Sequence, residues 1–194
     1  MNTNRIRYKH RDFHLKEIDK FTNIDWSLEK YGCGPTSIAN VLKNYGFDVN
    51  PIDIAKKILF DINGNFDTTY LRNKGINDKG LIYCLERLIK EDKFNISYKI
   101  VKIDFSNPNS QKQKVIDLMK QGNMAIIHVG PSEIGPLTFS KSGHYLVISD
   151  IDEDNNFYVI NSNKIGDNQL GIPFDYDTII KNMIGRKESF NFLF

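Results

Sequence analysis

Apolar side chains recur every three or four residues in several stretches of the first 121 residues. This spacing is typical of helices that bury one face. The first stretch ends before Gly46, which favours helix termination, and the second begins with Asn50 as N-cap and Pro51 and Asp53 in the first turn. We predict helices over residues 34–45, 51–59, 78–91 and 110–121.

After residue 95 the pattern changes to short apolar or alternating runs, which are typical of strands. We predict strands over residues 96–103, 124–129, 145–149, 157–160 and 189–194, and a short helix over residues 174–183. Residues 5–9 alternate basic and apolar side chains, which fits an edge strand, a loose arm or a solvated tail. Helices followed by an antiparallel-leaning sheet predict an α+β fold. Because no repeat or linker interrupts the chain, we expect a single domain spanning residues 1–194.

The composition is that of an ordinary globular domain, with 194 residues, 40% hydrophobic and 26% charged. A net charge of +2 is too small to indicate a nucleic-acid partner. The apolar runs are too short to span a membrane, and residues 1–20 lack the apolar core of a signal peptide. We expect no nucleic-acid or membrane partner and, by default, a cytoplasmic protein; release by lysis or association with a phage stays open. The sequence indicates no oligomeric state, and its 21 asparagines reduce the weight of any single one.

The two cysteines are too few for a disulfide framework and form no C-x-x-C motif. Cys33 follows Gly32 and precedes Gly34 at the start of the first predicted helix. A helix N-terminus stabilises a thiolate, and the glycines leave room around the sulfur. The backbone N–H of Cys33 is then a natural oxyanion donor. Cys33 is therefore a candidate nucleophile, although most cysteines are simply small buried side chains.

A thiolate nucleophile needs a base, which is normally a histidine held by a third polar group. His10 and His14 lie in the basic N-terminal stretch, where solvated side chains are expected. His128 interrupts an apolar strand and fits a core or sheet-face position. His144 instead begins a predicted strand after a loop rich in Gly and Pro, which makes it the candidate base.

A predicted hairpin supplies the third group. If the turn is centred on Asp152 and Glu153, His144 lies directly opposite Asn161, and Leu146 and Ile148 face Val159 and Phe157 on the same side. Directly opposed residues have Cβ atoms about 5 Å apart, which lets an Asn side chain orient an imidazole. A slip of one residue would separate the pair.

The sequence of residues 31–42 closely resembles the nucleophile helix of a branch of the papain-like cysteine peptidase superfamily, the bacteriocin-processing (double-glycine leader) peptidases. Residues 143–148 are similar to the histidine strand of that branch, and residues 158–162 occupy the place of its Asp-Pro pair. The resemblance covers residues 20–190. It implies a papain-like α+β fold, in which a helical N-terminal half packs its nucleophile helix on an antiparallel β-sheet.

Carried over residue by residue, the resemblance implies Cys33 as nucleophile, His144 as general base and acid, and Asn161 as the residue that orients His144. Asn161 replaces the usual Asp of this branch. The family generally carries a Gln about six residues before the cysteine, where it donates to the oxyanion, and a lost oxyanion donor typically slows catalysis about 10²–10³-fold. No Gln precedes Cys33 in this chain, so Ser27, at the same spacing, and Asn23 are the candidate donors.

These residues favour a cysteine hydrolase that cleaves a peptide or isopeptide amide in a peptide-like substrate through an acyl-thioester, without a cofactor. A peptidoglycan hydrolase or transpeptidase would use the same chemistry. A weakened or inactive binding module on the same fold is the alternative that the missing Gln favours. A metal site formed by Cys33, Cys84, His128 and His144 is disfavoured, because Cys84 lies on the apolar stripe of a helix. We expect residues 129–143 to line the substrate cleft.

Overall fold

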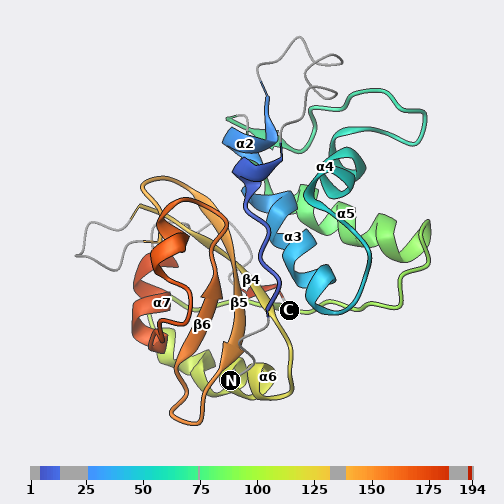
Figure 1. The fold of residues 1–194 in the computed structure, drawn as a ribbon. Coiled ribbons are helices and arrows are strands. Elements are labelled where there is room, and N and C mark those ends of the chain that lie inside the picture. Colours follow the sequence, from blue (N-terminus) through green and yellow to red (C-terminus); the bar gives the residue numbers. More distant parts are fainter. Residues whose placement is uncertain (1–4, 14–25, 74, 132–138, 184–191, 194) are drawn as a thin grey trace. The chain divides into compact units, whose positions relative to one another are not determined.

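The computed structural model describes residues 5–13, 26–73, 75–131, 139–183 and 192–193 (Figure 1). The chain forms two compact units: the helical unit, residues 6–98, and the sheet unit, residues 1–5 and 99–194. Helices together with an antiparallel sheet confirm the predicted α+β class. The single domain over residues 1–194 and the packing of the nucleophile helix on the sheet stay predictions.

The helical unit contains, in chain order, η1 (His10–Asp12), α2 (Leu28–Tyr31), α3 (Cys33–Asn44), α4 (Pro51–Leu59), β1 (Leu71–Arg72), β2 (Gly75–Ile76) and α5 (Asp78–Lys90). The three helices predicted in this unit lie within one residue of their expected bounds. Asn50 caps α4 as predicted: its Oδ1 accepts from the N–H groups of Ile52 at 2.8 Å and Asp53 at 3.1 Å. Gly46, with φ of +91°, follows the end of α3 in the left-handed conformation that glycine adopts most easily.

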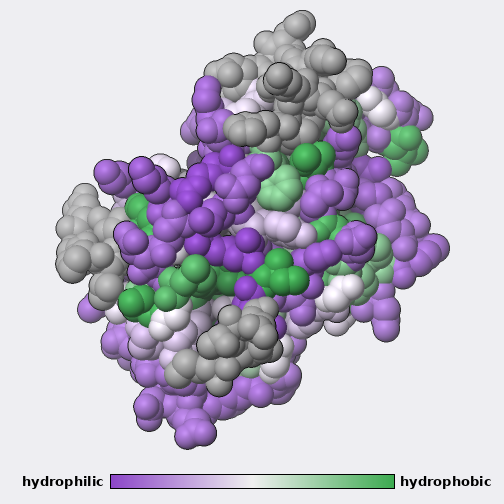
Figure 2. All heavy atoms as spheres, viewed as in Figure 1, coloured by the Kyte–Doolittle hydropathy of each residue, from purple (hydrophilic) through white to green (hydrophobic). Residues whose placement is uncertain are grey.

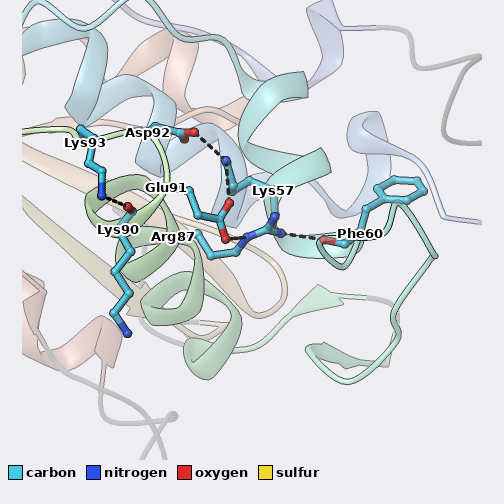
Figure 3. A network of polar contacts seen from close by, with 7 residues as sticks. All are labelled: Lys57, Phe60, Arg87, Lys90, Glu91, Asp92 and Lys93. Carbon is cyan, nitrogen blue, oxygen red and sulfur yellow. Dashed lines mark hydrogen bonds and ion pairs between the residues drawn. The ribbon is translucent and has the colours of Figure 1, made fainter.

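Helices α4 and α5 are joined by charged side chains at the C-terminal end of α4 (Figure 3). Nη1 of Arg87 donates to the carbonyl oxygens of Lys57 and Phe60, each at 2.7 Å. Nε of Arg87 donates to Glu91 at 2.8 Å, and Lys57 contacts Glu91 and Asp92 at 3.2 and 2.9 Å. The hydrogen bond between Arg87 and Glu91 raises the pKa of Arg87 and lowers the pKa of Glu91. An arginine of α5 therefore satisfies carbonyls at the end of α4.

The N-terminal arm, residues 5–9, forms neither an edge strand nor a solvated tail. Asn40 and Asn44, one turn apart on α3, each bind a residue of this extended arm through both amide atoms. Asn40 accepts from the N–H of Tyr8 at 2.6 Å and donates to its carbonyl at 3.2 Å, and Asn44 does the same with Ile6 at 3.0 and 2.8 Å. The two amides therefore act on the arm as a neighbouring strand would.

The sheet unit contains β3 (Ile100–Val101), η2 (Pro108–Gln111), α6 (Lys112–Lys120), β4 (Ala125–Val129), β5 (His144–Ile151), β6 (Phe157–Ile160), η3 (Ile165–Asn168), α7 (Tyr176–Met183) and β7 (Phe192–Leu193). The sheet order is β3-β7-β4-β5-β6, and each pair is antiparallel. Alternate residues of β4, β5 and β6 bury one face of the sheet together with side chains of α6 and α7. Among the described residues, the exposed large apolar side chains are Ile6, Tyr45, Ile62, Ile100, Leu170 and Ile172. On the face seen in Figure 2, hydrophilic residues cover most of the surface.

The strand predicted over residues 96–103 is wrong except for β3. The chain up to Tyr98 belongs to the helical unit. There the rings of Phe94 and Phe47 stack with centroids 4.6 Å apart, and the hydroxyl of Tyr98 donates to Glu86 of α5 at 3.4 Å. Packing against a helix thus replaces strand pairing. Most of the predicted strand over residues 189–194 and residues 132–138 of the predicted cleft loop lie outside the described residues.

The predicted register of the β5–β6 hairpin is wrong by two residues. Ile148 pairs with Val159, where the expected partner was Phe157, and a bulge separates Ile148 from Asp150. The turn holds three residues between Asp152 and Asn156, because Asn155 adopts a left-handed φ of +65°. A shift of two keeps every side chain on its predicted face, whereas a shift of one would not.

Candidate functional site

Cys33 is the first residue of α3, and its side chain is partly buried. The carbonyl oxygen of Gly32 accepts the N–H of Thr36 at 2.9 Å, which is the first hydrogen bond of α3. Pro35 has no N–H to leave unsatisfied in the same turn. Cys33 therefore lies at the positive end of a 12-residue helix, a position that in general favours a thiolate.

Gly32 is required by packing in the turn between α2 and α3. A Cβ at this position would overlap the carbonyl oxygen of Leu28 and lie 2.5 Å from its Cδ1. Leu28 is fully buried, so its side chain has no open solvent into which it could move. The glycine before Cys33 thus lets the chain enter α3 directly from α2.

His144 and Asn161 lie at the end of the apolar face shared by β5 and β6, as predicted. Nε2 of His144 lies 2.9 Å from Oδ1 of Asn161, and both side chains are buried. The register places them diagonally rather than directly opposite. Diagonal neighbours lie about 7–8 Å apart at the backbone, within reach of long side chains. Because Oδ1 can only accept, Nε2 carries the proton in this pair, and in neutral His144 the lone pair lies on Nδ1.

Two residues that the sequence did not indicate hold the Asn161 side chain. Its Nδ2 donates to the carbonyl oxygen of Phe139 at 2.9 Å and to Oε1 of Gln169 at 2.8 Å. The N–H of Asn163 donates to Oδ1 of Asn161 at 3.3 Å. Gln169 follows η3 in an irregular segment, and Phe139 contributes only its backbone, so no periodic pattern marks either residue.

The other candidate residues have structural positions. Cys84 is fully buried in α5, and burial raises the pKa of its thiol to about 12, which confirms its place in the core. His128 stacks on Tyr145 of the neighbouring strand with ring centroids 4.1 Å apart, which confirms the sheet-face position. His10 lies in η1, and His14 lies outside the described residues. Within the described ranges, no three His, Cys, Asp or Glu side chains are grouped to hold a metal ion.

The two oxyanion candidates remain predictions. Ser27 is the N-cap of α2, and its Oγ accepts the N–H of Lys30 at 3.3 Å. Asn23 lies outside the described residues.

Cys33 thus belongs to the helical unit, and His144 and Asn161 belong to the sheet unit. Residues 15–183 match the family model described as the Peptidase_C39 like family, a stretch that contains all three. The chain belongs to this family. Membership confirms the predicted kinship with the bacteriocin-processing branch of papain-like peptidases and supports a cysteine peptidase-like function.

A solved structure of a C39-like peptidase shares the fold. A C39-like peptidase from Bacillus anthracis matches with a TM-score of 0.58 and 12% identity, covering 100% of this chain and 94% of its own. The peptidase domain of Streptococcus ComA, a bi-functional ABC transporter of a quorum-sensing pathway, matches with a TM-score of 0.49 and 14% identity, covering 85% and 90%. No curated protein matches this chain. Among the described residues, no helix is long and apolar enough to cross a membrane.

Proposed function

We propose that this C39-like protein is a cysteine peptidase that hydrolyses a peptide or isopeptide amide with Cys33, His144 and Asn161. The observation that carries the proposal is the buried hydrogen bond of 2.9 Å between His144 and Asn161. This bond occupies Nε2 and leaves the lone pair of a neutral ring on Nδ1, which is the arrangement that a general base requires. The start of α3 supplies the second requirement, a cysteine at a helix N-terminus.

The proposed reaction proceeds in two steps. The Cys33 thiolate attacks the scissile carbonyl carbon, a C–S bond forms, and the C–N bond breaks as protonated His144 gives its proton to the leaving amine. His144 then takes a proton from water, the resulting hydroxide attacks the thioester, and the acid product leaves as the thiolate is restored. Asn161 keeps the ring oriented through both steps by a neutral hydrogen bond.

The oxyanion of each tetrahedral intermediate needs donors. The backbone N–H of Cys33 is one candidate, because the attacked carbonyl carbon is bonded to the sulfur of the same residue at the start of α3. Ser27 and Asn23 are the proposed side-chain donors in place of the Gln that the chain lacks before Cys33. This departure favours the second candidate function, a binding module on the same fold with little or no activity.

Alkylation of Cys33 separates the two functions. The folded chain is labelled with iodoacetamide between pH 5 and 9, and the modified cysteine is mapped by mass spectrometry. The peptidase proposal predicts fast labelling of Cys33 at acidic pH, slower labelling in His144→Ala, and protection of Cys84. His128→Ala is the matched control, because it removes a histidine that stacks on Tyr145 in the same sheet.

Labelling of Cys33 no faster than that of an unfolded cysteine peptide would reject the activated nucleophile. An accessible but slowly reacting Cys33 that His144→Ala leaves unchanged would support the binding module. Fast, His144-dependent labelling would support the chemistry shared by a peptidase, a peptidoglycan hydrolase and a transpeptidase; acyl transfer to an added amine would distinguish the last.

A further inference from the structure

The side chain of Asn161 makes four hydrogen bonds, which is the full capacity of a primary amide. Its oxygen accepts from His144 and from the N–H of Asn163, and its nitrogen donates to Phe139 and Gln169. A backbone carbonyl can only accept, so the amide group that faces Phe139 must be the NH₂ group. The orientation of the Asn161 amide therefore follows from its partners.

Gln169 supplies the second acceptor for Nδ2 of Asn161. The carbonyl oxygen of Phe139 also accepts Nδ2 of Asn163 at 3.0 Å, so it is shared between two donors. Gln169 is 7% exposed, and its Oε1 lies 2.8 Å from Nδ2 of Asn161. Rotating the amide by half a turn would bring its oxygen against the carbonyl oxygen of Phe139, which can only accept, and would require Gln169 to turn its own amide as well.

We infer that Gln169 is a positioning residue that locks the amide of Asn161 with its oxygen toward His144, and so fixes the ring with its proton on Nε2. The same arrangement accounts for Asn at a position where the family branch usually carries Asp. A carboxylate would place an oxygen against the carbonyl of Phe139, which cannot rotate away. The catalytic meaning rests on the proposed function, whereas the network itself is a property of the sheet unit.

Two substitutions separate a positioning role from a merely structural one. Gln169→Met keeps the approximate shape and removes the acceptor, and Gln169→Glu keeps an oxygen acceptor in either ionisation state. If Gln169 only fills space, the buried carboxyl of Gln169→Glu should destabilise the fold more than the thioether of Gln169→Met. If it positions Asn161, the Glu variant should keep the network that the Met variant loses. Asn182→Leu is the matched control, because it removes another buried amide of the sheet unit, one that donates to Thr178.

The first readout is nuclear magnetic resonance of the full chain labelled with ¹⁵N. We expect slowly exchanging signals from Nε2–H of His144 and from the NH₂ group of Asn161. These signals should be lost in Gln169→Met and retained in Gln169→Glu and Asn182→Leu. The second readout is the alkylation rate of Cys33, which should fall about threefold to tenfold in Gln169→Met and stay within about twofold in Gln169→Glu, as one lost hydrogen bond implies.

Retention of both signals in Gln169→Met would overturn the inference, whatever the alkylation rates. Loss of the signals in a chain whose Cys33 never reacts quickly would instead reject the proposed function and keep the positioning role. If Gln169→Met does not fold, Gln169→Ala removes the same acceptor with a smaller side chain. Retention of both signals in Gln169→Ala would overturn the inference, and their loss would support it.

Discussion

In the helical unit, asparagine side chains form hydrogen bonds with backbone groups. Asn50 caps α4, and Asn40 and Asn44 bind the extended arm. In the sheet unit, Asn161 binds the ring of His144, and its other edge is held by Phe139 and Gln169. The same side chain therefore contributes stability in one unit and the geometry of a titratable ring in the other. Substitutions in the helical unit should change the free energy of unfolding, and those around Asn161 should change reactivity as well.

Asn161→Asp is expected to have the largest effect. The new carboxylate would face the carbonyl oxygen of Phe139 in a buried site, and an unsatisfied buried group of this kind costs about 1–3 kcal/mol, more when charged. We expect the alkylation rate of Cys33 near pH 7 to fall roughly 10- to 100-fold as the introduced carboxylate and the ring of His144 move out of alignment. The control is Asn182→Asp, which likewise places a carboxylate against a backbone carbonyl oxygen, that of Thr178, and leaves the Asn161 amide intact.

The same variant tests the orientation of the amide through pH. Burial against an acceptor should raise the pKa of the introduced carboxyl above its unfolded value, so the folded state favours the protonated form. The melting temperature of Asn161→Asp should then be lower than that of the unchanged chain. This difference should be smallest at acidic pH and should grow as pH rises through the raised pKa. A deficit that grows toward acidic pH would contradict this orientation.

Gly32→Ala is expected to be the most disruptive change in the helical unit. Its Cβ would overlap the carbonyl of buried Leu28, and overpacking typically costs about 1–3 kcal/mol. Gly46→Ala is the matched control: its Cβ meets no atom within 4 Å, so the only cost is that of the left-handed φ of +91°. Urea unfolding should show the larger loss for Gly32→Ala, and an equal loss in both variants would contradict the packing argument.

The two units also differ in how far the sequence predicts them. Helices α3, α4 and α5 have local start and stop signals, such as Asn50 and Gly46, and their bounds follow from these signals. The sheet depends on distant partners. The hairpin register depended on Asn155 adopting a left-handed conformation, and the strand over residues 96–103 was reduced to β3 by packing against α5.

The candidate site shows the same division. The sequence placed Cys33 at a helix start and His144 on the same face as Asn161, because helix caps and strand alternation are local rules. The acceptors Phe139 and Gln169 follow only from three-dimensional folding: one acts through its backbone and the other lies in an irregular segment. The roles of Asn40 and Asn44 also escaped prediction, since asparagines are abundant and their partners lie more than 30 residues away.

Arg87→Met should weaken the contact between α4 and α5 without affecting His144. It removes the donor to the carbonyl oxygens of Lys57 and Phe60, and hydrogen bonds to charged groups contribute about 1.5–3 kcal/mol. We expect hydrogen–deuterium exchange to rise in α4 and α5, with the sheet unit unchanged. Arg87→Lys should restore little of the protection from exchange, because one ammonium group cannot reproduce the forked donor geometry of a guanidinium. Full recovery in the lysine variant would show that charge alone matters here.

Asn40→Ala and Asn44→Ala form the last and smallest test, within the asparagine pair that holds the arm. Each variant loses two hydrogen bonds to the arm. Asn40 is fully buried and Asn44 is partly exposed, so water can replace the lost hydrogen bonds more readily in Asn44→Ala. We expect a loss of about 1–2 kcal/mol for Asn40→Ala and about half of that for Asn44→Ala. Exchange at Tyr8 and Ile6 should increase in the matching variant, while the Nε2–H signal of His144 stays in place. Loss of that signal in either alanine variant would contradict the distinction between Asn40 and Asn44, which stabilise the fold, and Asn161, which orients His144.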